Sequence, residues 1–370
     1  MKVVILSCNT GGGHNSAARA IWGCLRGKGA EADIVDALRF MPKVQSRVIT
    51  KGHVFAYRNL PKLYGVGYRF EENHTPKGMY RQCGPASEKL YPFLLEQGYE
   101  AVVCVHVFPA LMLTQIRRAH GLTLPVFFVA TDYTCSPGVE LTQADVYCVP
   151  RDLGQEFARS GIPQERILET GIPVGADCYA PRDRAPARRA LGLDPERRQV
   201  VISCGSMGCG PMRSLALLLA DRLPEDTELT VLCGNNRSLK RDLKLLERKG
   251  RVRVLGFTDQ MFAWLAAADV LLSKPGGLTS TEAMTMGVPL ICIDAVPGCE
   301  TRNLQFFCGH GLAATARRVP GLVRLTLELL EHPAASEEMV SRQRARFAPK
   351  AGEAIAEAVC DRLRTGREEG

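Results

Sequence analysis

The chain has 370 residues, 46% hydrophobic and 23% charged, which is typical of a folded protein of about two domains. Its fourteen cysteines mostly stand singly in apolar runs and form no Cys-x-x-Cys pair, so neither a disulfide framework nor a structural zinc site is expected. The longest apolar run, residues 101–113, is too short to cross a bilayer, and the first residues lack the pattern of a signal peptide. We therefore expect a cytoplasmic protein that at most lies on a membrane.

Apolar, β-branched runs alternate with helical patterns through the first half of the chain. A helix is predicted at about 16–28. The runs predict strands at residues 2–7, 30–38, 101–107, 125–131, 144–150 and 166–174. Such alternation is typical of a parallel sheet covered by helices.

A second alternation follows a crossing segment rich in Pro, Ala, Arg and Asp. It predicts strands at 199–205, 228–234, 252–257, 269–274 and 288–294, and helices at 211–222, 236–248 and 259–267. The last stretch, about 336–366, is charged and helical. We predict an α/β chain of two Rossmann-like domains, residues 1–170 and 199–345, joined by a linker at 171–198, with a C-terminal helix at 346–370 that packs back on the first domain.

Each half has a glycine-rich loop after its first strand, where α/β folds bind ligands. The first loop is Gly11-Gly12-Gly13-His14, and the second runs from Cys204 to Gly210. Neither fits Gly-x-Gly-x-x-Gly, and neither contains the Lys-Ser/Thr pair of a P-loop. Backbone N–H groups at helix N-termini favour an anion such as a diphosphate. The alternative is that the glycines serve only tight turns.

The most specific stretch is "SKPGGLTSTEAMTMGVPLICIDAVPGCETRN", residues 273–303. A strand is predicted to end at Lys274, and a helix to open through Thr279, Ser280 and Thr281. Glu282 lies in the first turns of that helix, where its carboxylate either interacts favourably with the helix dipole or accepts hydrogen bonds from ribose hydroxyls. Glu300 is expected on a turn beside the same crevice, as a sugar contact or a solvated carboxylate.

These segments together resemble the GT-B glycosyltransferases of the monogalactosyldiacylglycerol synthase and processive diacylglycerol glucosyltransferase group. The resemblance is carried by GGGH, TDYTCSP, TGIPV, CGSMG, KPGGLTSTEA and PGxExxN, in this order. More distantly, the chain is similar to the transferase that adds N-acetylglucosamine to lipid-linked muropeptide. The resemblance implies two domains facing each other across a cleft, a UDP-sugar as co-substrate without a metal, and an inverting transfer that gives a β-glycoside.

The resemblance also implies roles for single residues. Glu282 would hold the ribose, the turn at Gly256-Phe257 would face the uracil, and Glu300 with Cys299 would contact sugar hydroxyls. The family often has glutamine where Cys299 stands, and a tryptophan and another histidine after the Thr-Asp pair, neither of which follows Asp132 here. The expected diphosphate and further donor contacts are Gly12, Gly13, Gly205, Ser206, Met207, Gly208, Lys274, Gly276, Gly277, Thr279, Ser280 and Asn303.

His14 is the preferred candidate for the base that deprotonates the acceptor, because an unperturbed imidazole is largely neutral at cytoplasmic pH. It could instead position phosphate or acceptor, or only shape the turn. Asp132, at the end of a strand, is the reserve base, with an N-cap as its alternative role. His53, His74 and His106 receive no role.

Residues 39–91 carry ten Lys or Arg against three Glu, together with eight aromatic residues. This interleaving suits an anionic membrane surface at the inner face of the cell membrane, and the alternative is an ordinary solvated face. The residues expected to touch membrane or acceptor are Lys43, Arg47, Lys51, Phe55, Tyr57 and Arg58.

Three functions compete. We favour a transferase that moves a hexose from a UDP-sugar to a diacylglycerol-type lipid. The runner-up is an enzyme of the same architecture that uses a UDP-N-acetylhexosamine, either transferring it to a lipid-linked cell-wall precursor or acting as a 2-epimerase or hydrolase. The third, nucleic-acid binding, rests only on the basic segment, and the donor motif argues against it.

Overall fold

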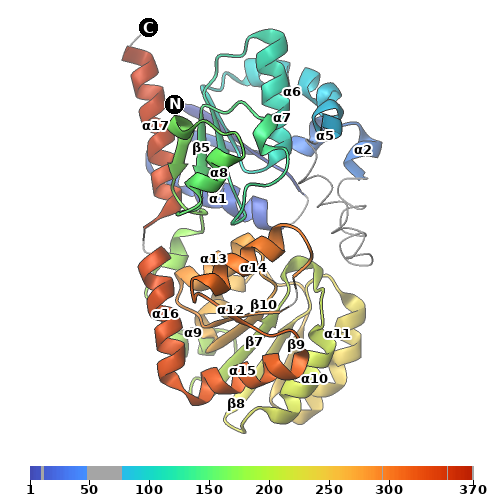
Figure 1. Cartoon of the computed structure of the whole chain (residues 1–370). Coiled ribbons are helices and arrows are strands. Elements are labelled where there is room, and N and C mark those ends of the chain that lie inside the picture. The colour runs from blue at the N-terminus through green and yellow to red at the C-terminus, as the bar shows by residue number, and fades with distance from the viewer. Residues whose placement is uncertain (10–11, 48–76, 294, 348, 369–370) are drawn as a thin grey trace. The chain divides into compact units, whose positions relative to one another are not determined.

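Two parallel sheets organise the chain in the computed structural model, which describes residues 1–9, 12–47, 77–293, 295–347 and 349–368 (Figure 1). The chain divides into two compact units. The first comprises residues 1–175, 297–299 and 350–370, and the second comprises residues 176–296 and 300–349.

The sheet of the first unit has six parallel strands in the order β2-β1-β3-β4-β5-β6. β1 is almost entirely buried, as expected for a strand covered on both faces. The strands are β1 Lys2–Ser7, β2 Glu31–Asp36, β3 Ala101–Cys104, β4 Val126–Val129, β5 Val146–Val149 and β6 Ile167–Glu169.

Helices connect these strands, and the C-terminal helix α17 packs against α1 (Figure 1). α17 buries residues at helical spacing, including Ile355, Val359 and Leu363. Gly352 allows the close approach, because a methyl group there would lie 3.0 Å from the Cys24 sulfur. The helices are α1 Gly12–Gly27, η1 Ala37–Phe40, α2 Lys43–Arg47, α5 Lys77–Gln82, α6 Gly84–Gln97, α7 Val107–His120, η3 Val139–Leu141, α8 Gly154–Arg159, η4 Gln164–Arg166 and α17 Ala351–Glu368.

The second unit also contains a parallel sheet of six strands, in the order β12-β11-β10-β7-β8-β9. The strands are β7 Arg198–Ser203, β8 Thr227–Leu232, β9 Val252–Leu255, β10 Val270–Ser273, β11 Leu290–Cys292 and β12 Ala314–Thr315. The helices are η5 Ala176–Tyr179, α9 Arg184–Ala190, η6 Gly205–Met207, α10 Met212–Arg222, α11 Arg237–Leu243, η7 Lys244–Lys249, α12 Met261–Ala267, α13 Gly277–Thr285, α14 Cys299–Gly309, α15 Val319–Glu331 and α16 Pro333–Phe347.

The strand orders locate the place where each sheet can bind a ligand. In the first sheet the direction of winding reverses between β1 and β3, and in the second between β7 and β10. Open α/β sheets bind ligands outside the carboxyl ends of the strands at such a point. Ser203 pairs with Ser273 at the ends of β7 and β10, so the loops that follow these two strands begin side by side.

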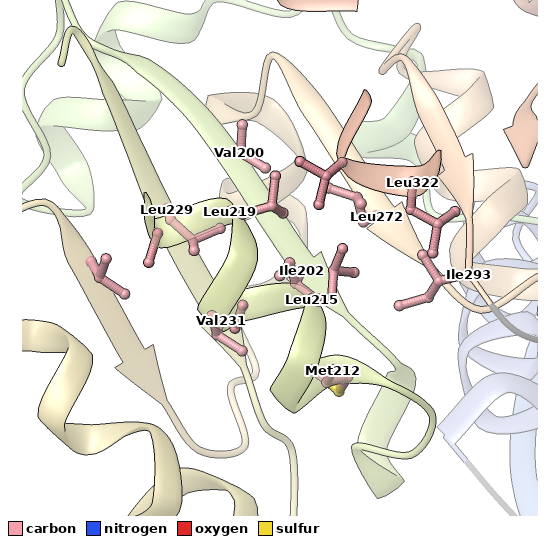
Figure 2. Packing of buried hydrophobic residues seen from close by; sticks show 14 of the residues in the cluster. Val200, Ile202, Met212, Leu215, Leu219, Leu229, Val231, Leu272, Ile293 and Leu322 are labelled. Atoms are coloured by element: carbon pink, nitrogen blue, oxygen red, sulfur yellow. The ribbon is translucent and has the colours of Figure 1, made fainter. Parts of the chain in front are cut away.

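The core of the second unit forms where alternate side chains of one sheet face meet α10 and α15 (Figure 2). Val200 and Ile202 on β7 contribute, as do Leu215 and Leu219 on α10, and all four are fully buried. Burying a side chain of this size is worth about 1.5–3 kcal/mol, so this layer holds the strand ends in place.

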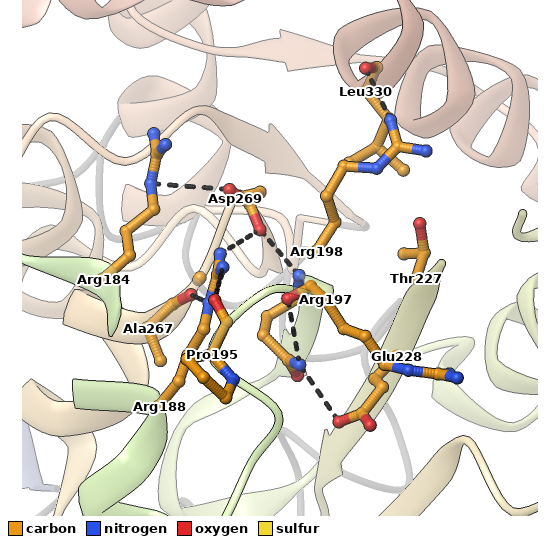
Figure 3. A network of polar contacts seen from close by, with 12 residues as sticks. Arg184, Arg188, Pro195, Arg197, Arg198, Thr227, Glu228, Ala267, Asp269 and Leu330 are labelled. Carbon is orange, nitrogen blue, oxygen red and sulfur yellow. Dashed lines mark hydrogen bonds and ion pairs between the residues drawn. The ribbon is translucent and has the colours of Figure 1, made fainter. Parts of the chain in front are cut away.

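A polar cluster ties α9 to the start of the sheet in the second unit (Figure 3). Asp269, just before β10, accepts hydrogen bonds from the buried Arg188 side chain at 2.5 Å and from the backbone N–H of Gln199 at 2.6 Å. Arg188 also donates to the carbonyls of Ala267 and Pro195. The arginine-rich crossing segment is therefore anchored to the sheet by a satisfied buried charge pair.

The predicted α/β architecture with two parallel sheets is confirmed, with differences at the ends of elements. α1 begins at Gly12 rather than near residue 16, so the first glycine loop runs directly into the helix. The strand predicted at 101–107 ends at Cys104, because α7 begins at Val107 with His106 as its N-cap. The helical stretch at 336–366 consists of two helices, α16 and α17.

Candidate active site

His14 lies in the first turn of α1, at the point where the first sheet reverses its winding. Its Nδ1 is 2.9 Å from the carbonyl oxygen of Val105, the residue that follows β3. The Thr131 hydroxyl, after β4, lies 3.1 Å from the same nitrogen. Three strand ends therefore converge on one ring nitrogen.

This arrangement fixes the tautomer of His14. A carbonyl oxygen only accepts, so Nδ1 carries the proton and donates it to Val105, which leaves Nε2 with a lone pair. Burial lowers the pKa of His14 below its usual value, against the smaller opposing effects of the Asp132 charge and the Val105 hydrogen bond. The imidazole is therefore neutral at neutral pH, in the form that can accept a proton.

Asp132 and His106 complete the surroundings of His14. The carboxylate of Asp132 acts electrostatically on His14, so the two predicted catalytic residues belong to one site. The His106 ring packs edge-on against His14 with centroids 4.6 Å apart, and its Nδ1 accepts a hydrogen bond from the backbone N–H of Phe108. Also in the first unit, the Ser136 hydroxyl lies 3.5 Å from the Cys299 sulfur.

The second glycine loop is packed against the turn after β8. A methyl group on Gly208, whose φ is +57°, would lie 2.1 Å from the Cys233 carbonyl oxygen, and one on Gly234 would lie 2.5 Å from the Ser206 oxygen. Only glycine fits at either position. The Ser206 carbonyl accepts from the backbone N–H of Asn235, and the Gly208 carbonyl accepts from the Asn236 side chain, both at 2.8 Å.

These two hydrogen bonds set the direction of the loop's N–H groups. In a trans peptide the carbonyl and the following N–H point opposite ways. With the carbonyls of Ser206 and Gly208 directed at the Asn235-Asn236 turn, the N–H groups of Met207 and Cys209 point away from it. Outward N–H groups at a strand end are a suitable cradle for a phosphate oxygen.

The Lys-Pro-Gly-Gly turn brings a cation to the same place. A methyl group on Gly205 would lie 3.4 Å from Cε of Lys274, which puts the lysine beside the glycine loop. Lys274 Nζ lies 2.8 Å from Glu300 Oε1, and the two side chains are 22% and 12% exposed. Burial, the largest single effect, lowers the pKa of Lys274, but the charge and hydrogen bond of Glu300 together with two nearby thiols outweigh it, so the net shift is upward and the ammonium stays charged.

Several predicted donor residues have side chains that serve the scaffold. Asn303 is fully buried in α14 and donates to the Pro275 carbonyl at 3.0 Å, which positions the turn. Ser280 is fully buried as well, so its hydroxyl lies inside the unit. Glu300, expected on a turn, lies in the first turn of α14, and it also accepts from the Val296 backbone N–H at 3.2 Å.

The remaining predicted donor residues lie at or near strand ends. Glu282 occupies the second turn of α13, beyond the turn in which the helix dipole acts most strongly. Phe257, after β9, is 63% exposed, which is unusual for a large apolar ring and leaves it open to stacking. Gly276 is the N-cap of α13 and makes no side-chain cap, while Gly277 and Thr279 form the first turn.

Most of the predicted membrane segment lies outside the described residues, including Lys51, Phe55, Tyr57 and Arg58. Lys43 and Arg47 bound the short helix α2, and the Lys43 side chain is exposed. Over the described part of the chain, no helix has the length and apolar character needed to span a bilayer. Within the same residues, no three His, Cys, Asp or Glu side chains are grouped as a metal site.

Sequence reasoning missed the residues that act through their backbone or through capping. Val105 and His106 lie at the end of a strand within a long apolar run, so the residue types there give no sign of a functional site. Cys209 was overlooked because its contribution is an N–H group. The signal for Val105 and His106 is their position directly after β3 at the reversal of the sheet, and the signal for Cys209 is its place in the glycine-rich loop after β7.

Residues 14–174 match the monogalactosyldiacylglycerol (MGDG) synthase family, and residues 199–305 match the glycosyltransferase family 28 C-terminal domain. A processive diacylglycerol beta-glucosyltransferase from Staphylococcus carnosus is 25% identical over 349 residues, covering 92% of this chain and 88% of the relative.

Solved structures share the fold. MurG from Acinetobacter baumannii superposes with a TM-score of 0.61 at 18% identity, covering 97% of this chain and 99% of MurG. HepE from Anabaena, solved with UDP and glucose, superposes with a TM-score of 0.61 at 15% identity, covering 99% of this chain and 100% of HepE. The GT-B fold predicted for the chain is thereby confirmed. The chain is a glycosyltransferase of the GT-B fold, whose first domain matches the monogalactosyldiacylglycerol synthase family and whose second matches the glycosyltransferase family 28 C-terminal domain.

Proposed function

We propose that the protein transfers a hexose from a UDP-sugar to the hydroxyl of a diacylglycerol-type lipid at a membrane surface, with inversion, to give a β-glycolipid. The observation that carries the chemistry is the fixed tautomer of His14, which leaves Nε2 without a proton at the carboxyl end of the first sheet.

The donor assignment rests on the loops at the reversal of the second sheet. Outward N–H groups of Met207 and Cys209, the first turn of α13 and the Lys274 ammonium together suit a diphosphate. Glu282 would accept from the ribose hydroxyls, because the helix dipole does not explain a carboxylate in the second turn. The structural relative HepE was solved with UDP and glucose, which agrees with this donor class.

The acceptor assignment rests on the relatives. The Staphylococcus carnosus relative is named a processive diacylglycerol beta-glucosyltransferase, and it aligns with 92% of this chain. The match of the first domain to the monogalactosyldiacylglycerol synthase family favours the same kind of acceptor, a neutral diacylglycerol with one hydroxyl. These relatives favour the lipid transferase over the 2-epimerase or hydrolase that the sequence alone left open.

In the proposed step the acceptor oxygen attacks the anomeric carbon from the face opposite UDP. The bond from that carbon to the β-phosphate oxygen breaks, and the hydroxyl proton passes to Nε2 of His14. An α-linked donor therefore yields a β-linked product. The negative charge that develops on UDP would be stabilised by Lys274 and by the N–H groups at the loop and helix N-terminus.

We propose that this charge stabilisation needs no metal, since the donor elements present a lysine and oriented N–H groups and no Asp-x-Asp pair. Full activity should persist in excess EDTA. Activity that disappears with EDTA and returns with Mg²⁺ would contradict this part of the proposal.

The experiment that tests the function supplies vesicles of diacylglycerol and phosphatidylglycerol with UDP-glucose, UDP-galactose or UDP-N-acetylglucosamine. Mass spectrometry should detect a hexosyldiacylglycerol, and the anomeric proton should identify a β-linkage by NMR. Release of free sugar or epimerised UDP-sugar without a glycolipid would overturn the proposal in favour of the runner-up enzyme.

A further inference from the structure

Three successive strand ends of the second unit form a continuous glycine-lined surface. Gly205 and Ser206 follow β7, Gly234 follows β8 and Gly256 follows β9. A methyl group on Gly234 would lie 2.8 Å from the Gly205 oxygen, and one on Gly256 would lie 3.7 Å from the Gly234 oxygen. The backbones of the three loops therefore lie side by side, with glycine at each point of close approach.

Lys240 reaches the far end of this surface from helix α11. Asn236 caps α11 by accepting from the Leu239 backbone N–H at 3.1 Å, and it also donates to Gly208, so the helix start is fixed to the first loop. Lys240 follows one turn later. A methyl group on Gly256 would lie 3.7 Å from Cδ and 3.8 Å from Nζ of Lys240, which places the ammonium against the glycine that precedes the exposed Phe257.

Within the described residues, two lysines that follow Lys240 in the chain form ion pairs, whereas Lys240 does not. Lys244 pairs with Glu247, and Lys249 pairs with Asp221. Lys240 itself makes no ion pair with any residue in the described ranges, although its side chain is exposed at a strand end rather than on an outer helical face. Glu247 is held by Lys244 and by the Val254 backbone N–H; its charge also acts on Lys240, but the two side chains form no ion pair.

The location of Lys240 separates it from the phosphate loops. β9 is two strands from β7, and neighbouring strands lie about 4.8 Å apart, so Gly256 is on the order of 10 Å from the loop after β7. Lys274 already supplies a cation at that loop. A nucleotide whose diphosphate lies at the reversal of the sheet has its base, not its phosphates, at a distance of this order.

We propose that the Lys240 ammonium donates a hydrogen bond to the O4 carbonyl of uracil and selects uracil over cytosine. This inference rests on the proposed UDP-sugar donor. An ammonium has three donors and no acceptor, so it bonds to the O4 carbonyl of uracil but faces the amino group that cytosine carries at the same position. Phe257 would supply the stacking surface, and Lys240 the edge contact that distinguishes the two bases.

The test compares Lys240→Met, which keeps the apolar stem, with Lys240→Arg and with the matched control Lys249→Met. Calorimetry with UDP and with CDP gives the affinity of each variant for the two nucleotides. The wild-type protein should prefer UDP. Lys240→Met should weaken UDP binding roughly ten- to a hundredfold, as for loss of a hydrogen bond to a charged group, while CDP binding changes little. Lys240→Arg should retain the preference, and Lys249→Met should behave as wild type.

Two results would overturn the inference. Unchanged affinities of Lys240→Met for both UDP and CDP would show that the ammonium touches no nucleotide. Equal weakening of UDP and CDP binding would assign the ammonium to phosphate. A wild-type protein that binds neither nucleotide would instead overturn the proposed UDP-sugar donor, so the two failures are distinguishable.

Discussion

His14 is a partly buried imidazole whose proton is held on the nitrogen facing the protein, and this leads to a prediction about pH. A base must be neutral, and burial lowers the pKa of His14, so the acid limb of kcat/KM should have its midpoint below pH 6.5. His14→Gln removes the base and should lower kcat about 10²-fold or more while UDP affinity in calorimetry stays nearly unchanged. Close to full turnover by His14→Gln would show that the residue positions phosphate or acceptor.

The variant Asp132→Asn tests whether Asp132 is itself the base or only raises the pKa of His14 through its charge. The Asp132 charge raises the pKa of His14, so its removal should move the acid limb of kcat/KM further toward low pH, with kcat at neutral pH reduced far less than in His14→Gln. Initial rates between pH 4.5 and 8 measure this on a set of buffers of about equal ionic strength. If Asp132→Asn abolishes turnover while His14→Gln does not, Asp132 is the base.

Glu282 is expected to carry ribose binding, and its removal leaves two hydroxyls without an acceptor. Glu282→Ala should weaken UDP binding by about 1–3 kcal/mol in calorimetry. Glu328→Ala, an exposed carboxylate on α15, is the matched control and should have no effect. Unchanged UDP affinity in a folded Glu282→Ala protein would remove the ribose assignment.

Glu300 is a different case because the structure pairs it with Lys274. Glu300→Ala should change the preference among UDP-sugars while UDP affinity stays nearly intact. It should also destabilise the second unit by about 1.5–3 kcal/mol, since a mostly buried ammonium loses its charged partner. Competition assays with UDP-glucose and UDP-galactose, together with urea unfolding, measure both effects. An unaltered sugar preference would argue that Glu300 serves only the ion pair.

The residue types of the site could be predicted from the sequence, but their contacts could not. His14, Glu282 and Glu300 stand out because each is a titratable side chain within or beside a glycine-containing segment that follows a strand. That Glu300 holds Lys274 and Asn303 holds the Pro275 carbonyl depends on how α14 packs, and α14 begins 25 residues after Lys274. Contacts between segments far apart in the chain produce no repeating pattern in the sequence from which they could be predicted.

At the scale of elements, the glycine loop after β7 is shaped by close packing against the turn after β8. Gly208→Ala would bring a methyl group within 2.1 Å of the Cys233 carbonyl oxygen and would also strain a backbone with positive φ. We expect it to displace the N–H groups of the loop and to abolish measurable UDP binding. Thermal unfolding and calorimetry on the same samples separate lost binding from lost folding.

Gly250→Ala is the matched control for Gly208→Ala. Its φ is +72°, but nothing lies within 4 Å of the added methyl group. It should therefore cost only the roughly 1–2 kcal/mol of left-handed backbone strain and leave UDP affinity intact. Equal loss of UDP binding in both variants would show that backbone strain, rather than the contact with Cys233, governs the loop.

The arginine cluster around Asp269 predicts how firmly the crossing segment is attached (Figure 3). Asp269→Ala leaves the buried Arg188 guanidinium without its carboxylate and should destabilise the second unit by about 3–5 kcal/mol. Asp226→Ala, which removes the exposed partner of Arg198, should cost at most about 1 kcal/mol. Urea unfolding followed with and without UDP reports this unit, and similar losses for both variants would contradict the distinction.

The existence and order of the elements could be predicted from the sequence, whereas their ends were less certain. Buried parallel strands read as continuous apolar runs, so eleven of the strands in the described residues fall within or beside predicted ones. The two-residue strand β12 is too short to give a pattern. α1 begins early because three glycines suppress the helical signal while the backbone of Gly12 and Gly13 still enters the helix.

At the scale of the whole molecule, the chain returns to the first unit after completing the second. Residues 350–370 belong to the first unit, where α17 covers α1. The sequence predicts a C-terminal helix that packs back on the first domain, but the pattern of a charged amphipathic helix does not identify the helix that it covers. The apolar residues Ile355, Val359 and Leu363 account for its burial once the partner is known.

The basic, aromatic segment at 39–91 leads to a prediction about binding of the whole protein to membranes. Replacing Lys43, Arg47, Lys51 and Arg58 by Gln should weaken binding to vesicles that contain anionic lipid by up to about 1 kcal/mol per charge, and by less in high salt. The matched control replaces four exposed arginines of the second unit, Arg222, Arg248, Arg317 and Arg324, by Gln, with the same change of net charge. Sedimentation with neutral and anionic vesicles measures both. The two variants differ only in where the charges are removed, so the control should bind as the wild-type protein does. Equal weakening of both variants would assign the effect to net charge. Equal binding of the wild-type protein to neutral and anionic vesicles would contradict the electrostatic attraction itself.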